Sequence, residues 1–171
     1  MKGGDPVLDA IMNRRSIRKY RPDRVTDDQI NALLTAAMMA PSARNGQPWH
    51  FVVCRDRPVL DALRASHPYA AMLEEAPLCV AVCAEEGDVA GYYQQDCAAA
   101  TQNLLLAATA MGLGTCWMGV APRPERMEAV ARALNLPPHI KPFNLIAVGH
   151  PAETRPRPDR YRADRIHYDR W

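Results

Sequence analysis

Arginine side chains gather near the start of the chain, where five of them lie within residues 14–24. If this segment is extended, Arg14, Ser16 and Arg18 point to one side, because side chains alternate along a strand. Arg15 then points to the other side. Two guanidinium groups that flank a hydroxyl donor suit a phosphate or another anion with several oxygens. The segment is a candidate anion site, and a solvated basic surface is the alternative interpretation.

A second group of arginines lies within residues 155–170, and its first two members, Arg155 and Arg157, are separated by Pro156. A proline restricts the backbone, so less entropy is lost when neighbouring side chains close around a ligand. A charge-assisted hydrogen bond contributes roughly 1.5–3 kcal/mol, so four such contacts bind a phosphate strongly and two modestly. We expect both groups to converge on one anion. The remaining arginines alternate with acids and are expected on a solvated surface: Arg160, Arg162, Arg165 and Arg170.

A turn-rich loop, residues 40–49, lies between the two arginine groups and carries Ser42, Asn45 and Gln47. Amide and hydroxyl groups on such a loop suit the polar edge of a heterocycle better than a metal ion. Ser and Asn also cap turns, so a purely local role is the alternative.

Sequence patterns predict the elements that must position these residues. Asp5 precedes a proline at a first helical position, and Thr26 with Gln29 forms a capping box. Apolar residues at helical spacing predict helices over residues 6–13, 27–39, 58–65, 89–111 and 124–134. Short apolar runs predict strands over residues 50–54, 78–83, 114–118 and 143–148.

These elements predict an α+β protein with three layers, in which a sheet of about four strands has helices on both faces. We expect a single domain, residues 1–171, that ends in an extended arm, residues 151–171. The C-terminal half of the helix over residues 89–111 is apolar nearly all round, which is typical of a helix buried on every side. A second copy of the chain is therefore expected to cover part of the surface, and a self-contained monomer is the alternative.

Composition and charge exclude several classes of protein. The chain has 171 residues, 48% hydrophobic and 23% charged, as in ordinary soluble domains. Its five cysteines lack metal-binding spacing, which indicates buried free thiols in a reducing cytoplasm and no metal site. No signal peptide is expected, because the first twenty residues are rich in charge and lack an apolar run. No membrane segment is expected, because polar residues 101–103 interrupt the longest uncharged run. A net charge of only +2, with acids between the tail arginines, argues against a nucleic-acid partner.

Five motifs, in order over almost the whole chain, resemble the nitroreductase family of flavoproteins. Each motif alone is weak, but five in register are specific. The motifs are Arg14-Arg15-Ser16-Ile17-Arg18, Ala40-Pro41-Ser42 with Asn45-Gly46-Gln47-Pro48-Trp49, the segment Gln102–Ala108, the segment Gly112–Gly119, and Gly149-His150-Pro151 with the basic tail.

The resemblance implies a nitroreductase-like three-layer α-β-α fold, with a mixed, mostly antiparallel sheet flanked by helices. It implies a homodimer with an exchanged C-terminal arm and FMN (flavin mononucleotide) at each interface site. The residues implied to bind FMN are Arg14, Arg15, Ser16, Arg18, Arg155 and Arg157 for the phosphate and part of the ring; Pro41, Ser42, Ala43, Asn45 and Gln47 from the loop, usually the partner's; and Cys116, Trp117, Met118 and Gly119 beside the isoalloxazine ring.

The resemblance also implies a reaction. NAD(P)H would deliver hydride to flavin N5, and a nitroaromatic, a quinone or a similar small acceptor would then take two electrons in a ping-pong scheme. No side chain is needed as an acid or base. Arg18 is the candidate for stabilising the negative charge of the reduced flavin. Two alternatives are specialised flavin chemistry, such as flavin fragmentation or reductive dehalogenation, and a non-catalytic flavin-binding module.

The chain departs from the family pattern at two places. Larger members carry an Asn and a Lys that reach the pyrimidine edge of the flavin, and Pro68 and Ala71 stand near those positions here. The segment from Glu85 to Gln95 is also short, which predicts that the helical roof of the pocket is truncated and the pocket more open. These departures leave the flavin potential and the range of acceptors undetermined.

Overall fold

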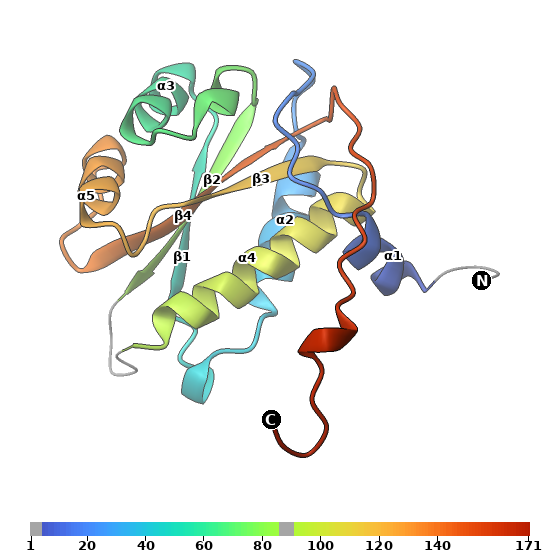
Figure 1. Ribbon diagram of the computed structural model, residues 1–171. Helices are drawn as coiled ribbons and strands as arrows, with labels where there is room; N and C mark the ends of the chain where they lie inside the picture. Colours follow the sequence, from blue (N-terminus) through green and yellow to red (C-terminus); the bar gives the residue numbers. More distant parts are fainter. Residues whose placement is uncertain (1–4, 86–90) are drawn as a thin grey trace.

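The computed structural model describes residues 5–85 and 91–171, and its elements form three layers (Figure 1). The middle layer is a sheet of four strands: β1 (Trp49–Cys54), β2 (Leu78–Glu85), β3 (Gly114–Gly119) and β4 (Ile140–Gly149). The strand order is β1-β2-β4-β3, so β1 and β3 are the edges. All neighbouring strands are antiparallel. The mixed sheet that the resemblance implied is thus reduced to one isolated parallel bridge between Ser16 and Thr115.

Helices cover both faces of the sheet. The described helices are α1 (Pro6–Asn13), α2 (Asp27–Met38), α3 (Arg57–Ser66), α4 (Tyr93–Ala110) and α5 (Pro124–Ala133), with short 3-10 turns at Ala43–Asn45, Ala71–Glu74 and Ala163–Arg165. The expected N-caps form. Asp5 accepts hydrogen bonds from the first turn of α1, and the capping box of Thr26 and Gln29 is present at α2.

The strands are apolar on both sides because each side meets helices. Cys79, Ala81 and Leu145 face one core, which α3 and α5 close with residues such as Leu63 and Val130. The alternate strand positions, such as Val80 and Ile146, face a second core closed by α2 and α4. The predicted three-layer α+β architecture is therefore confirmed.

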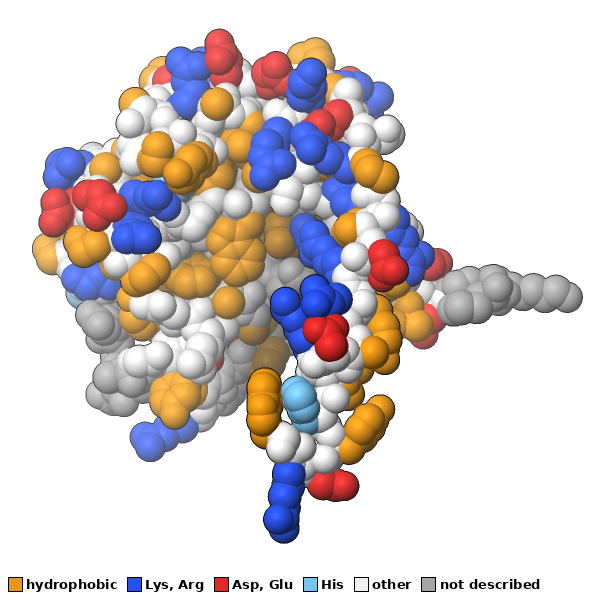
Figure 2. All heavy atoms as spheres, in the orientation of Figure 1, with side chains coloured by type: hydrophobic (Ala, Val, Ile, Leu, Met, Phe, Trp, Pro, Cys, Tyr) orange, Lys and Arg blue, Asp and Glu red, His pale blue; other side chains and the backbone are white. Residues whose placement is uncertain are grey.

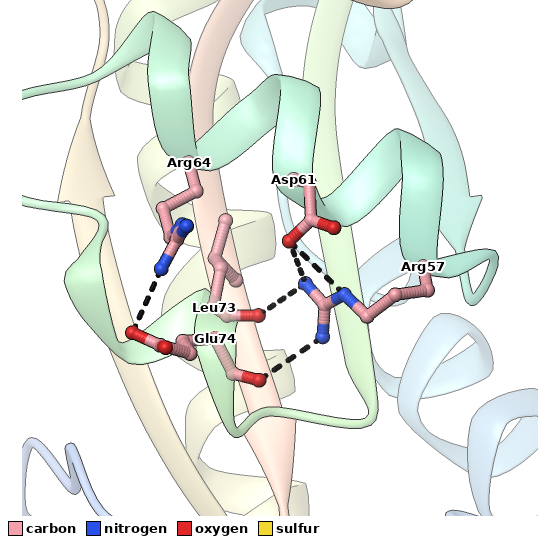
Figure 3. A network of polar contacts seen from close by, with 5 residues as sticks. All are labelled: Arg57, Asp61, Arg64, Leu73 and Glu74. Atoms are coloured by element: carbon pink, nitrogen blue, oxygen red, sulfur yellow. Dashed lines mark hydrogen bonds and ion pairs between the residues drawn. The ribbon is translucent and has the colours of Figure 1, made fainter.

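A polar network fixes α3 to the turn before β2 (Figure 3). Arg57 donates to the backbone carbonyls of Leu73 and Glu74 and pairs with Asp61, while Arg64 lies 2.7 Å from the Glu74 carboxylate. Each charged side chain of this network therefore has a carboxylate, a guanidinium or a backbone carbonyl as its partner.

The longest helix differs from its expected form. Helix α4 begins at Tyr93, and residues 89 and 90 of the predicted helix lie outside the described residues. It is not buried on every side within one chain, because Ala98, Ala99 and Leu106 remain partly exposed. The sheet and α2 cover two of its sides, and α1 contacts it as well. The predicted truncation between Glu85 and Gln95 also falls partly on residues outside the description.

The ends of the chain extend from the body. After β4 the arm runs past α4 and α1 and then away from the sheet (Figure 1). Its aromatic residues Tyr161, Tyr168 and Trp171 are exposed. Within the described parts of the chain, none of the helices has the length and apolar character needed to cross a membrane.

Candidate functional site

Two segments far apart in the sequence pair beside the edge strand β3. The Ile17 amide donates to the Thr115 carbonyl (2.8 Å), which attaches the first arginine segment to the sheet. The Ala152 amide donates to the Lys19 carbonyl (2.9 Å), which attaches the arm to that segment. The arginines on both segments are therefore held side by side by backbone hydrogen bonds.

Two glycines make this close pairing possible. Gly114 and Gly149 face each other across β3 and β4. A Cβ at Gly114 would lie 2.9 Å from Ile17, and one at Gly149 would lie 2.9 Å from the ring of Tyr20. Real Cβ contacts are not this short, so any larger residue would push the arginine segment away from the sheet.

The pairing surrounds one cavity of about 760 Å³ with basic side chains. Figure 2 shows Lys and Arg side chains gathered along the part of the arm nearest the body. The polar residues that line the cavity are Arg14, Arg15, Gln102, Arg157, Asp159, Arg160 and Tyr161. The expected convergence of the two arginine groups therefore occurs, through Arg14 and Arg15 on one side and Arg157 on the other.

Two arginines in the cavity were expected elsewhere from the spacing of the sequence, although the resemblance implied Arg15 as a phosphate ligand. Arg15 was expected on the opposite side from Arg14, but its side chain folds back to donate to the carbonyls of Met12 and Arg14 (3.0 and 2.7 Å) and of Pro156 (2.9 Å). A long, flexible side chain is not confined to the side of the strand from which it starts. Arg160, expected on the solvated arm, also lines the cavity.

Positive charge is concentrated at Arg14. Partial burial lowers the pKa of its guanidinium, and the charges of Arg160 and Arg15 lower it further. An arginine remains protonated at any working pH, so the cost is one of repulsion and lost hydration, with no loss of charge. An anion with several oxygens would relieve this repulsion and supply acceptors for the guanidinium groups.

Arg18 and Arg155 are placed differently from the cavity arginines. The Arg18 amide donates to one oxygen of Glu153 (2.6 Å), and the Arg155 guanidinium lies 3.0 Å from the other. The Arg18 amide is the main reason that the pKa of Glu153 is lowered, and Arg155 adds to the effect. Neither arginine belongs to the lining of the cavity in the part of the chain that the structure describes. Glu153 thus fixes both arginines at the junction of the two segments.

The four β3 residues implied to lie beside a ring face in different directions. Cys116 and Met118 are buried in the core on the α3 and α5 side. Trp117 faces the opposite side, half-buried, with its ring 5.8 Å from that of Phe143. Gly119 is exposed at the end of the strand. A ligand at this edge could therefore contact the Trp117 side chain and the backbone of the strand, but not the side chains of Cys116 and Met118.

The loop between α2 and β1 has a strained backbone. Arg44, Asn45 and Gln47 have positive φ angles of 52, 55 and 47°, which cost free energy in residues other than glycine. The loop is held by two side chains: the Ala43 amide donates to Asp96 of α4 and the Gln47 amide donates to Ser42, each at 3.0 Å. Such strain persists where the surroundings impose it, often at functional sites.

Asp96 itself is unusual. Its side chain is only 6% exposed, and within the described residues its second oxygen, Oδ2, has no hydrogen-bond partner. Of the expected loop residues, Pro41, Ser42, Ala43, Asn45 and Gln47, none lines the arginine cavity of the same chain. A ligand held by both the arginines and this loop would therefore have to extend beyond this cavity.

Several residues of this site were missed in the sequence. Gln102 stands in a motif quoted for the resemblance, but its place at the cavity was not expected, and Asp96 looks like an ordinary first-turn acid. Glu153 was read as one of several acids that neutralise the arm. Its role arises from the pairing of residues 17–21 with 150–153, which no local pattern reveals.

Comparison with known proteins identifies relatives over most of the chain. A family model described as "Nitroreductase family" matches residues 11–67 and 60–150. A protein of Methanothermobacter thermautotrophicus, provisionally named NADH dehydrogenase/NAD(P)H nitroreductase, is 44% identical to this chain. The aligned region covers 96% of this chain and 87% of that protein. A crystal structure from Parabacteroides distasonis with the same provisional name is 40% identical, with a TM-score of 0.95 over 98% of this chain and 100% of that one.

A further solved structure contains a ligand. It is a provisionally named nitroreductase from Desulfovibrio desulfuricans in complex with FMN, 34% identical, with a TM-score of 0.85 over 98% of this chain and 99% of that one.

Proposed function

The chain belongs to the nitroreductase family of FMN-dependent oxidoreductases, and on that premise we propose that it transfers hydride from NAD(P)H to small two-electron acceptors. Nitroaromatics and quinones are the acceptor classes proposed. The observation that carries the proposal is the cavity of about 760 Å³ in which Arg14, Arg15, Arg157 and Arg160 gather.

The residues of this cavity fit the phosphate of FMN. A phosphate monoester carries nearly two negative charges at neutral pH and three acceptor oxygens. The cavity supplies several guanidinium forks, and their mutual repulsion at Arg14 would be relieved by a dianion. We propose Arg14, Arg15 and Arg157 as the phosphate ligands, with Arg160 in addition. Ser16 and Arg18 would lie further along the segment, toward the ring.

The edge of β3 fits a planar ring. Gly119 has no positive φ, and a Cβ built on it would meet nothing within 4 Å in this chain. Neither backbone conformation nor internal packing therefore requires a glycine at this position. Close approach of a ligand to the backbone is a common reason for glycine, and a ring stacked beside Trp117 would supply it.

Bound FMN would supply the redox chemistry by accepting hydride at N5 and passing two electrons on, with donor and acceptor using the same pocket in turn. The chain would bind the phosphate, orient the ring against β3 and stabilise negative charge near the pyrimidine side of the ring. Arg18 is the proposed residue for the last role, because Glu153 fixes its backbone and its charge does not depend on pH.

We propose that the site is completed by a second copy of the chain. Helix α1 has no buried residue, and Val7, Leu8, Ile11 and Met12 are all between 42% and 64% exposed. An apolar helix face of this kind usually marks an interface. A homodimer would cover it, receive the arm and bring the strained loop of one chain to the ring bound by the other. The buried free cysteines and the net charge of only +2 support a cytoplasmic small-molecule enzyme with no nucleic-acid partner.

An anaerobic titration tests this function. The purified protein should bind added FMN with a change in visible absorbance, and NADH or NADPH should bleach that absorbance. An added nitroaromatic or quinone should restore it. A protein that takes up no FMN would contradict the proposal. Tight binding without turnover would instead favour a non-catalytic flavin-binding module, and breakdown of the flavin during turnover would favour specialised flavin chemistry.

A further inference from the structure

We propose that His67 is a positioning residue that fixes the flavin-facing end of β3 through the carbonyl of Gly119. The proposal rests on the proposed function, in which the ring of FMN lies against this edge. His67 follows α3 and is only 3% exposed. Its Nε2 lies 2.8 Å from the Gly119 carbonyl oxygen, across 52 residues of sequence.

The hydrogen bonds of His67 define its tautomer. The Tyr69 amide donates to Nδ1 at 3.2 Å, so Nδ1 is an acceptor and carries no proton. The ring proton is therefore on Nε2, which donates to Gly119. The imidazole is neutral in this arrangement and acts as a fixed bridge between the end of α3 and the end of β3.

A second donor supports the same carbonyl. Arg126 of α5 donates from Nη1 to the Gly119 carbonyl at 3.2 Å, and its guanidinium lies 5.4 Å from the centre of the Tyr69 ring. The Tyr69 ring in turn meets the His67 ring edge-on at 6.0 Å. Two elements, α3 and α5, therefore converge on one peptide carbonyl at the end of an edge strand.

The geometry of β3 shows what this anchoring achieves. The Val120 amide donates inward to the Phe143 carbonyl of β4 (3.1 Å). In an antiparallel ladder the adjacent residue then turns both its N–H and its C=O outward, so both groups of Gly119 face the open edge. His67 and Arg126 hold the outward carbonyl, and Phe143 holds the following amide. The outward Gly119 N–H is left in a defined direction toward the proposed ring position.

The bond from His67 to Gly119 matters because two side chains that larger relatives use are absent from this stretch. Pro68 and Ala71 stand near the places where larger relatives carry the Asn and Lys implied to reach the flavin, and neither side chain can donate a hydrogen bond. In this chain the same stretch reaches β3 through His67. We infer that it orients the flavin through the backbone of Gly119, because it cannot contact the flavin through those side chains.

The test compares His67→Phe with His67→Gln. Phe keeps the ring volume and removes the donor, whereas Gln retains an N–H donor near the position of Nε2. Ser66→Ala is the matched control, because Ser66 caps the same end of α3 by donating to Leu63 and does not touch Gly119. The readouts are the dissociation constant of FMN, the midpoint potential of the bound flavin, and amide hydrogen exchange at Gly119 and Val120 without FMN.

In His67→Phe, the amides of Gly119 and Val120 should exchange about tenfold faster, and FMN should bind about two- to tenfold more weakly. The midpoint potential of the bound flavin should fall, because a fixed N–H donor favours the electron-rich reduced ring. His67→Gln should restore most of each value, and Ser66→Ala should leave the potential unchanged. An unchanged potential and affinity in folded His67→Phe, or equal shifts in Ser66→Ala, would overturn the proposal.

Two results separate this proposal from the proposed function. If wild-type protein fails to bind FMN, the proposed function is wrong. If wild type binds FMN and His67→Phe has the same FMN affinity and midpoint potential as wild type, the proposed function stands and the positioning role is wrong. Should His67→Phe fail to fold, His67→Asn decides in the same measurements, because its shorter side chain withdraws the donor from the Gly119 carbonyl and leaves only Arg126 on it. An unchanged potential and affinity in His67→Asn would then overturn the positioning role.

Discussion

Arg14 and Arg157 differ from arginines such as Arg57 and Arg162 in what balances their charge. Arg57 and Arg162 each have a carboxylate within 3.1 Å. Arg155 has Glu153, at 3.0 Å. The cavity instead gathers Arg14, Arg15, Arg157 and Arg160 around one acid, Asp159, and the charges of Arg160 and Arg15 raise the electrostatic cost at Arg14. An unbalanced cluster of guanidinium groups is the residue-level signature of an anion site.

We predict that Arg14→Ala weakens FMN binding about tenfold to a hundredfold, since a charge-assisted contact contributes roughly 1.5–3 kcal/mol. Fluorescence titration of the apoprotein with FMN measures the effect. Arg162→Ala is the control, because Arg162 lies on the exposed arm and pairs with Asp164. Equal losses in the two variants would mean that the arm acts only by its net charge.

The cysteines give a prediction with a defined pH dependence. All five are buried and free, and burial raises the pKa of Cys54 to about 11 and those of Cys83 and Cys97 to about 12. Native protein at pH 8 should therefore not react with a thiol reagent such as dithionitrobenzoate until it is unfolded. Rapid reaction of a native thiol would show that the core opens locally.

The same shifts affect stability. A thiol whose pKa is raised by folding stabilises the folded state fully below its unfolded pKa of about 8.5, and this contribution is lost as pH rises toward 11 or 12. Urea unfolding between pH 7 and pH 10 should show a falling midpoint, and Cys54→Ala should make the fall shallower. A midpoint independent of pH in this range would contradict the assignment.

At the scale of elements, α4 positions more than one part of the site. Gln102 lines the arginine cavity, while Asp96, less than two turns earlier, holds the strained loop at Ala43. Helix α4 therefore links the arginine cavity to the strained loop between α2 and β1. The sequence predicted this helix but not these contacts, since a helix of nearly uniform apolar character does not reveal which residues face which neighbour.

We predict that Asp96→Ala releases the strained loop, whereas Asp96→Asn, which keeps an acceptor oxygen for the Ala43 amide, largely preserves it. Amide exchange at Ala43 should accelerate about tenfold in Asp96→Ala, and FMN affinity should fall a few-fold, because the cost of the positive φ angles is no longer opposed. Gln95→Ala, at the exposed neighbouring position, is the control. Unchanged exchange in Asp96→Ala would show that Ser42 alone holds the loop.

At the scale of the whole molecule, the described chain leaves its two ends unpacked. The apolar face of α1 and the aromatic residues of the arm are exposed, although the body has two well-filled cores. Apolar surface of this extent on α1 and the arm favours association with a second copy of the chain.

We predict that Leu8→Asp converts a dimer into a monomer and abolishes FMN binding, because a carboxylate in the apolar α1 interface is costly and each site needs both chains. Light scattering after size-exclusion chromatography should give twice 19.0 kDa for wild type and 19.0 kDa for the variant. His139→Asp, at an exposed position before β4, should remain a dimer. A wild-type monomer that binds FMN tightly would refute the dimeric site.

The sequence by itself determined the elements and the chemistry of the site. Capping residues such as Thr26, apolar periodicity and short strand runs act over a few residues, so they predicted the three-layer fold. The predicted boundaries differ most at the start of α4, which begins at Tyr93, and at the start of β4, which begins at Ile140. The clustered arginines predicted an anion site because charge is a property of the residues themselves. Only the tertiary structure decided which of them lie together: Arg157 and Arg160 line one cavity with Arg14, while Glu153 pairs with Arg155. That choice, like the bond from His67 to Gly119, depends on pairing between segments more than fifty residues apart, and such pairing is set by packing of the whole chain.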